Sequence, residues 1–286
     1  MTLSRPEVLR LLVDNRISPS RALGQNFVAD PNTVRRIARL AGVGPGDRVV
    51  EIGAGLGSLT LALAETGASV VAVERDRWLV PVLEKVLATK APGAPVTVVE
   101  ADAMTLDWSV LLGAQPGWAL VANLPYNLAT PLVADLLDGV PAVQRMLVMV
   151  QREVGQRLVA APGDPAHGAV SVKVAYWAEA ALVGTVPSSV FVPRPRVGSA
   201  LVSLKRRSEP LVGPSLVSAA ELFGVVRAGF AQRRKMLRRA LAGFNVSTVV
   251  FDAAGIDGQA RAEQLSVEDW GRLAAAIAAS VGSSDA

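Results

Sequence analysis

The chain has 286 residues, of which 51% are hydrophobic and 19% are charged, so it is too apolar to be disordered and long enough for one large α/β domain or a domain of about 200 residues with a smaller companion. It contains no cysteine and one histidine, His167, which excludes disulfide frameworks, thiolate nucleophiles, Cys/His zinc sites and histidine-based triads. The net charge is only +4, but eleven cations and two acids fall between Phe191 and Arg239, which indicates either a polyanionic partner or a solvated helix face.

The N-terminal segment MTLSRPEVLRLLVDNR does not read as a secretion signal, because Glu7 and Asp14 interrupt its apolar stretch. No uninterrupted apolar run reaches the roughly 18 residues that a membrane-spanning helix needs. We therefore expect a cytoplasmic protein that has no membrane partner. With so few potential ligands, no metal site is predicted either.

A helix is expected near the N-terminus, since Asp30 and Pro31 precede the helical pattern of Thr33–Ala41 and Gly42 follows it. Apolar runs then alternate with helical patterns, and this spacing predicts βαβ units and a parallel sheet that is buried on both faces. Five runs are predicted as strands: Arg48–Gly53, Ser69–Glu74, Val96–Ala101, Trp118–Asn123 and Arg145–Gln151.

The pattern changes after Ala169. The runs VSVKVAYWA (170–178) and ALVSLK (200–205) are predicted as two antiparallel strands at one edge of the sheet, joined by a proline-rich loop. Beyond Pro210 and Pro214 only helical patterns remain. We therefore expect two domains, an α/β domain over residues 1–208 and a small helical domain over residues 209–286.

The segment EIGAGLGS ends the first strand of the predicted sheet. Gly53 and Gly55 permit a tight turn and leave room for a ligand beside the backbone. The third glycine of a dinucleotide fingerprint is missing, because Ser58 stands in its place. Alone, this loop is compatible with a simple strand-to-helix turn or with a nucleotide-like ligand.

Two carboxylates follow the next strands at the same edge. Glu74 ends the second strand, where a carboxylate can accept hydrogen bonds from a ribose diol. Asp102 follows the third strand, where it could bind an adenine amino group. Together with the glycine loop, they predict an adenosine-containing cofactor, either a dinucleotide or S-adenosylmethionine.

The fourth strand leads into Asn123-Leu124-Pro125-Tyr126. The lone pair of an exocyclic amine on a nucleobase is delocalised, so its methylation requires hydrogen-bond acceptors that draw the nitrogen toward tetrahedral geometry. We expect the Asn123 side-chain oxygen and the Pro125 carbonyl to be these acceptors. An extruded base also needs stacking surfaces, which Tyr126 and Phe191 could offer on opposite faces. The simpler interpretation of this motif is an Asn-capped turn.

The chain resembles the rRNA adenine N6,N6-dimethyltransferase family, and specifically its small-subunit branch. Eight segments carry the resemblance, in this order: LGQNFVAD, EIGAGLGSLT, VVAVERD, ADAM, NLPYN, MVQREVGQRL, FVPRPRVGSALV and FAQRRKML. The resemblance implies a Rossmann-like class I S-adenosylmethionine-dependent methyltransferase, with a mostly parallel seven-stranded sheet and a small all-α C-terminal domain. It also implies dimethylation of two adjacent adenosines near the 3′ end of 16S rRNA, by a monomer that acts on the 30S subunit or its precursor.

The resemblance further implies roles for single residues. Asn26 and the Val28 backbone would contact the methionine end of the cofactor, with Gly53 and Gly55 beneath it. Glu74 would hold the ribose hydroxyls, Asp102 the adenine amine, and Asn123 would lie between cofactor and target. Contacts to the rRNA backbone, which position a protein without specifying a base, would come from Arg233, Arg234, Lys235 and Arg238.

Some positions depart from the family's usual pattern. Ala54 stands where proline is usual and Gly198 where an acid is usual, and the latter change could weaken the grip of this loop on RNA. His167 lies in a segment that also departs, and we interpret it as a loop residue without a partner.

Three alternatives remain. The first is a 23S rRNA adenine methyltransferase of the antibiotic-resistance type, which shares the core motifs. The second is a non-catalytic nucleic-acid-binding assembly or transcription factor on the same fold. The third is an NAD-linked oxidoreductase, which the missing third glycine disfavours.

Overall fold

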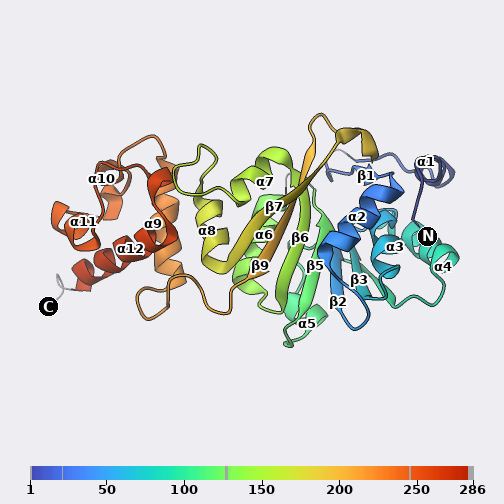
Figure 1. Ribbon diagram of the computed structural model, residues 1–286, viewed down its shortest axis with the longest axis horizontal. Helices are drawn as coiled ribbons and strands as arrows, with labels where there is room; N and C mark the ends of the chain where they lie inside the picture. Colours follow the sequence, from blue (N-terminus) through green and yellow to red (C-terminus); the bar gives the residue numbers. More distant parts are fainter. Residues whose placement is uncertain (1, 21, 126–127, 245, 283–286) are drawn as a thin grey trace. The chain divides into compact units, whose positions relative to one another are not determined.

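The computed structural model describes residues 2–20, 22–125, 128–244 and 246–282 (Figure 1). The chain divides into two compact units. The first contains Met1–Gly155 and Ala181–Arg206, and the second contains Gln156–Ala180 and Arg207–Ala286. Each unit therefore draws on two separate parts of the sequence.

The first unit contains a seven-stranded sheet with the strand order β4-β3-β2-β5-β6-β9-β7. Strands β2 to β6 pair in parallel, while β9 runs antiparallel to β6. The parallel strands β2 to β6 confirm the five predicted ones. The bounds are β2 Arg48–Ile52, β3 Ser69–Glu74, β4 Val96–Glu100, β5 Trp118–Asn123, β6 Val143–Gln151, β7 Ala178–Val186 and β9 Ser199–Arg206.

Helices connect these strands and enclose two buried apolar clusters. As predicted, Asp30 caps one of them: its side chain accepts a hydrogen bond from the Thr33 amide, and Gly42 ends the same helix in a left-handed conformation. The helices of this unit are α1 Arg5–Asp14, α2 Pro31–Ala41, α3 Ser58–Ala64, α4 Val80–Lys90, α5 Trp108–Leu112, α6 Ala129–Gly139 and the 3₁₀ helix η1 Ser188–Val190. Helix α7, Arg152–Leu158, runs from the first unit into the second.

A second, two-stranded sheet joins distant parts of the chain. Strand β1 (Phe27–Val28) pairs antiparallel with β8 (Phe191–Val192), so that Phe27 faces Val192 in register and Val28 faces Phe191. The Ala29 amide extends the contact by donating to the Val190 carbonyl. This pairing fixes the segment LGQNFVAD against the segment FVPRP.

Helices dominate the described part of the second unit, as expected for the C-terminal region. Its core surrounds Trp270, which is fully buried together with Leu222 and Leu273. The helices are α8 Ala169–Trp177, α9 Ala219–Ala231, α10 Leu237–Ala240, α11 Thr248–Ala254 and α12 Val267–Gly282, with 3₁₀ helices η2 Ala242–Phe244 and η3 Ala262–Gln264.

One predicted element is wrong. Residues 169–177 form helix α8 instead of a strand, although their β-branched, alternating pattern is typical of a strand. The Ser171 hydroxyl accepts from the Gly168 amide and donates to the Arg157 carbonyl. Val172 and Tyr176, four residues apart, both enter the core of the second unit. Tertiary packing therefore overrides the local preference, and the strand β7 begins only at Ala178.

The same packing shifts the division of the chain. The expected boundary after residue 208 lies close to the junction at Arg206 and Arg207. Residues 156–180, however, belong to the second unit and were expected in the first. The cause is again α8, whose apolar side chains contact α9 and α12.

Candidate active site

A cavity in the first unit opens at the carboxyl ends of β2, β3 and β5. Parallel α/β sheets bind their ligands at this edge. The cavity is lined by every described residue that was predicted to bind the cofactor, together with the predicted acceptor Pro125. These residues are Asn26, Val28, Gly53, Gly55, Glu74, Asp102, Asn123 and Pro125.

The glycine loop needs its glycines for two reasons. Gly53, Gly55 and Gly57 have φ values of 76°, 59° and 88°, which side chains rarely permit. A Cβ on Gly55 would also lie 3.1 Å from the ring of Phe27, and one on Gly57 would lie 2.7 Å from Leu83 Cδ1. The loop can therefore lie closely between β1 and α4 while it forms the floor of the cavity.

Glu74 is held at the end of β3 by backbone amides. Its Oε2 accepts from the Gly55 amide at 2.7 Å and its Oε1 from the Asp76 amide at 2.8 Å. Burial raises the pKa of this carboxyl, while the two backbone hydrogen bonds act in the opposite direction. Because each carboxylate oxygen can accept a second hydrogen bond, Glu74 remains able to receive the hydroxyls of a ribose.

Asp102 lies on the same rim, beyond β4. Its Oδ1 accepts from the Met104 amide at 3.0 Å, and its Oδ2 lies 3.2 Å from Nη1 of Arg75. Both Asp102 and Arg75 line the cavity. The structure thus brings a carboxylate to the position expected for an adenine contact, and it adds a neighbouring cation that the sequence did not single out.

Asn123 is oriented by the loop that leads into β1. Its side-chain Nδ2 donates to the Asn26 carbonyl at 3.0 Å, and the Asn26 side chain in turn donates to the Gly24 carbonyl at 3.1 Å. With its nitrogen occupied, the Asn123 amide has its oxygen left as an acceptor. This arrangement supports the acceptor role that the sequence suggested.

The expected role of Pro125 needs correction. Its carbonyl already accepts the amides of Leu128 and Ala129, each at 3.0 Å, at the start of α6. A carbonyl oxygen has two lone pairs, so this oxygen has no free position for a substrate amine. Pro125 lines the cavity, but its carbonyl is bound to the amides at the start of α6.

Of the expected aromatic pair, only Phe191 lies among the described residues, and its position differs from the prediction. Phe191 is completely buried in the core of the first unit, where it packs with Val28 and Leu201, and it is not among the residues that line the cavity. Its ring therefore offers no open face to a base in this structure. Tyr126, the other member of the pair, lies outside the described residues.

The cavity also contains two polar groups that the sequence analysis missed. Glu51 and Ser58 both line it, and Glu51 is only 1% exposed. Among the described residues, neither Glu51 Oε2 nor the Ser58 hydroxyl has a hydrogen-bond partner. An acid among the apolar residues Val49, Val50 and Ile52, two positions before the first glycine of the loop, was the available signal in the sequence.

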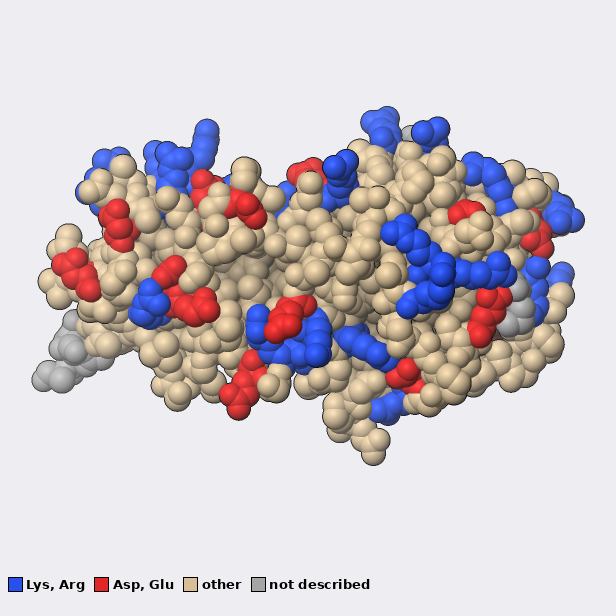
Figure 2. All heavy atoms as spheres, in the orientation of Figure 1, with Lys and Arg blue, Asp and Glu red and all other residues tan. Residues whose placement is uncertain are grey.

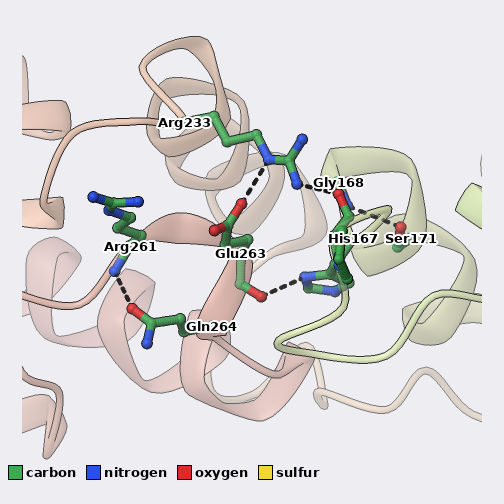
Figure 3. A network of polar contacts seen from close by, with 8 residues as sticks. His167, Gly168, Ser171, Arg233, Arg261, Glu263 and Gln264 are labelled. Atoms are coloured by element: carbon green, nitrogen blue, oxygen red, sulfur yellow. Dashed lines mark hydrogen bonds and ion pairs between the residues drawn. The ribbon is translucent and has the colours of Figure 1, made fainter.

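The basic block of the second unit consists of the four cations that were predicted to contact RNA, Arg233, Arg234, Lys235 and Arg238. One of them is already paired within the protein. Arg233 is bound by Glu263, with Nε 2.8 Å from Oε2, and it also donates to the Pro165 carbonyl (Figure 3). The prediction that it contacts RNA therefore competes with a structural role. Arg234, Lys235 and Arg238 are exposed, and Figure 2 shows cationic side chains projecting above α9 and α10.

His167 has a partner, contrary to expectation. It is 3% exposed, its Nδ1 lies 3.0 Å from the Glu263 carbonyl, and its ring meets Phe230 edge-on. Burial lowers the pKa of the imidazole. Figure 3 shows His167 and Arg233 both reaching Glu263, so this histidine helps to fix the segment before α8 to η3.

In the described part of the chain, no helix has both the length and the apolarity that crossing a membrane requires.

Comparison with known proteins places the chain in a family. A family profile described as "Ribosomal RNA adenine dimethylase" matches residues 18–279. The chain is 48% identical over 285 residues to Ribosomal RNA small subunit methyltransferase A of Cutibacterium acnes, which covers 96% of this chain and 95% of that protein. It is 50% identical over 264 residues to the protein of the same name from Kineococcus radiotolerans, with 91% and 86% covered.

Two solved structures share the architecture. A dimethyladenosine transferase from Plasmodium falciparum is similar with a TM-score of 0.72 and 23% identity, over 85% of this chain and 94% of that one, which shows the common fold. The 23S rRNA methyltransferase ErmE is similar with a TM-score of 0.64 and 26% identity, over 88% and 99%. With a profile that spans most of its length and relatives near half identity, the chain belongs to the ribosomal RNA adenine dimethylase family.

Proposed function

We propose that the protein dimethylates the N6 amines of two adjacent adenosines near the 3′ end of 16S rRNA, in the small ribosomal subunit or its precursor. The observation that carries this proposal is the oriented amide of Asn123 beside the acid-lined cavity. The relatives at 48–50% identity are named for the small subunit, which supports that substrate. We further propose that it acts as a monomer in the cytoplasm.

The cofactor is S-adenosylmethionine, and the described lining fits it. Glu51, Glu74 and Asp102 are acids, whereas Arg75 is the one cation among the described lining residues, and it is paired with Asp102. This balance suits a positively charged nucleoside and disfavours the pyrophosphate of a dinucleotide. Glu74 would hold the ribose and Asp102 the adenine, and the methionine end would lie along Asn26, Val28 and the glycine loop.

S-adenosylmethionine supplies an electrophilic methyl group when it is bound. The part of the protein is to hold the adenine N6 in line with that carbon, and the Asn123 side-chain oxygen accepts one N–H of the amine. Since the Pro125 carbonyl is occupied, we assign the second acceptor to the Leu124 carbonyl, to which no described residue donates. The amine held by the Asn123 oxygen and the Leu124 carbonyl would accept this methyl group from the sulfonium, which would leave as a thioether, and the surplus N–H proton would pass to water.

Contacts to the rRNA backbone would come from Arg234, Lys235 and Arg238. These side chains are exposed, and no acid among the described residues forms an ion pair with them. Binding of this kind neutralises phosphates and releases counterions, so it weakens as the salt concentration rises.

The experiment that tests the function compares substrates. The purified protein is incubated with S-adenosylmethionine and either 30S subunits or protein-free 23S rRNA, and methylated adenosines are mapped by mass spectrometry. We expect dimethyladenosine in 16S rRNA only. The similarity to a 23S rRNA methyltransferase makes 23S rRNA the second candidate, and modification of 23S rRNA alone would replace the proposal by that one. Binding of subunits without any methyl transfer would favour the non-catalytic alternative.

A further inference from the structure

Glu51 is the most deeply buried acid of the first unit's cavity, and the reaction described above does not use it. It lies in β2, one residue before the end of the strand, and its side chain is 1% exposed. Its Oε2 has no hydrogen-bond partner among the described residues. An ionised carboxylate in such a position is costly, because burial removes the water that would stabilise its charge.

Few groups around Glu51 offset this cost. Helix α3 brings two hydroxyls to this region: Ser58 lines the same cavity, and Thr60 acts on the pKa of Glu51. Thr60 lies close enough to lower the pKa of Glu51, yet neither hydroxyl completes a hydrogen bond. Helix α3 and the neighbouring strand β5 contain no titratable side chain. The donors that an ionised Glu51 would need are therefore present but unused.

The charged neighbours make ionisation harder. Glu74, at the end of β3, adds a negative charge near Glu51. Asp102 is a third acid on the cavity wall, and the cation Arg75 lies beside it instead of beside Glu51. Burial, with a smaller contribution from Glu74, raises the pKa of Glu51 to about 8. At neutral pH the carboxyl is therefore mostly protonated in the free protein.

A positively charged ligand in this cavity would reverse the balance. It places an opposite charge in a medium of low dielectric constant, which favours the ionised form of a nearby acid. We propose that Glu51 holds a proton in the free protein and releases it to solvent when the sulfonium-bearing cofactor binds, so that cofactor binding is coupled to the loss of one proton. The inference rests on the proposed function only in the identity of the cofactor.

The coupling predicts how the affinity for S-adenosylmethionine depends on pH. Below pH 8, cofactor binding must displace the proton, so the dissociation constant of S-adenosylmethionine should fall about tenfold between pH 7 and pH 9 and level off above that. The number of protons released should fall from about 0.9 at pH 7 to about 0.1 at pH 9. A neutral nucleoside without sulfonium or ammonium groups should release none.

Calorimetric titration tests this directly. S-adenosylmethionine is titrated into the full-length protein in buffers of different ionisation enthalpy, at pH 7 and at pH 9, which gives the number of protons released. The Glu51→Gln variant keeps Glu74, Asp102 and the ligand's own amino group, so any release that it loses belongs to Glu51. Glu84→Gln removes an exposed acid of α4 and serves as the matched control. 5′-Methylthioadenosine is the neutral ligand.

We expect about one proton fewer from Glu51→Gln than from the wild type and from Glu84→Gln at pH 7, and equal numbers at pH 9. Equal proton numbers at both pH values would overturn the proposal. If S-adenosylmethionine binds to none of the proteins, the proposed function fails as well, whereas binding without any Glu51-dependent release refutes the coupling alone.

A second measurement does not depend on the variant being folded. Infrared difference spectroscopy of the wild type should show the band of a protonated carboxyl group in the free protein and its loss when S-adenosylmethionine is added at pH 7. A spectrum without this loss would contradict the proposal even if Glu51→Gln cannot be prepared.

Discussion

Asn123 shows how a single amide can be made directional. Its nitrogen is bound to the Asn26 carbonyl, so rotation of the side chain by half a turn would place two oxygens against each other. In the proposed mechanism the acceptor is thus oriented before any substrate arrives, and preorganisation of this kind is usually the largest single contribution to catalysis.

The variant Asn123→Ala should lower the rate of methyl transfer by roughly 10²- to 10³-fold, the loss typical for one preorganised polar contact. Its thermal unfolding should stay near that of the wild type, because the side chain is only half-buried. Single-turnover transfer of labelled methyl groups to 30S subunits measures the effect. An undiminished rate would remove Asn123 from the mechanism.

Glu51 should also make the stability of the free protein depend on pH. Its pKa is about 8 in the folded chain and 4.5 for an exposed glutamate. The folded state therefore holds the extra proton, and its stabilising effect is complete below pH 4.5 and lost as the pH rises to 8. The free energy of unfolding should fall across this window by an amount on the order of a few kcal/mol.

Urea unfolding at pH 5, 6.5 and 8 checks this prediction. Most of the decline should be lost in Glu51→Gln, with a remainder from Glu74, whose pKa burial also raises, and the full decline should persist in Glu84→Gln. A decline of equal steepness in all three proteins would assign the pH dependence to other groups.

We expect Phe191 to contribute to the stability of the folded protein. Removing a fully buried phenylalanine leaves a cavity, and Phe191→Ala should cost about 3–5 kcal/mol of unfolding free energy, with a smaller loss for Phe191→Leu. Denaturant titration measures both. If Phe191→Ala instead kept full stability and lost only rRNA methylation, the stacking role suggested by the sequence would be restored.

At the scale of elements, the parallel strands were predictable because burial on both faces leaves continuous apolar runs in the sequence. The glycine loop was predictable for a similar reason, since positive φ values and close packing require glycine. Those signals are local, and they also placed Glu74, Asp102 and Asn123 correctly at one edge of the sheet.

Three features depended on contacts that the sequence does not display. Residues 169–177 become a helix only because a core from residues 207–282 receives their apolar side chains. The Pro125 carbonyl accepts the amides of Leu128 and Ala129 at the start of α6. The NLPY motif does not reveal that a helix begins so soon after it. Phe191 is buried because β8 pairs with β1, more than 160 positions earlier in the chain.

The helical state of residues 169–177 predicts a specific sensitivity. Ser171→Ala removes both the acceptor of the Gly168 amide and the donor to the Arg157 carbonyl, and it should destabilise the second unit by about 1–2 kcal/mol. Denaturant unfolding followed by circular dichroism measures this loss. Ser215→Ala, at an exposed position of the same unit, is the control and should have no measurable effect. Equal stability of both variants would argue against the helix cap.

At the scale of the whole molecule, the exposed cations of the second unit should determine how binding responds to salt. Replacing Arg234, Lys235 and Arg238 by alanine should weaken binding to 30S subunits and reduce the slope of log K against log salt by up to about one unit for each lost phosphate contact. Filter binding at several salt concentrations gives the slope.

Arg233 is the natural control for this experiment, because it belongs to the same block but is bound to Glu263. Arg233→Ala should lower the stability of the second unit and leave most of the slope intact. A triple variant with an unchanged slope would mean that the phosphate contacts lie elsewhere, for example among the cations that Figure 2 shows over α2.

The interleaved chain of the two units has a consequence during synthesis. Helix α8 leaves the ribosome about a hundred residues before the last helix that covers its apolar side chains, Val172 and Tyr176 among them. At 5–20 residues per second, translation needs roughly 5–20 s to supply that cover. Throughout this interval these apolar side chains lack the helices that cover them in the folded protein, so the emerging chain offers a chaperone an apolar binding segment there.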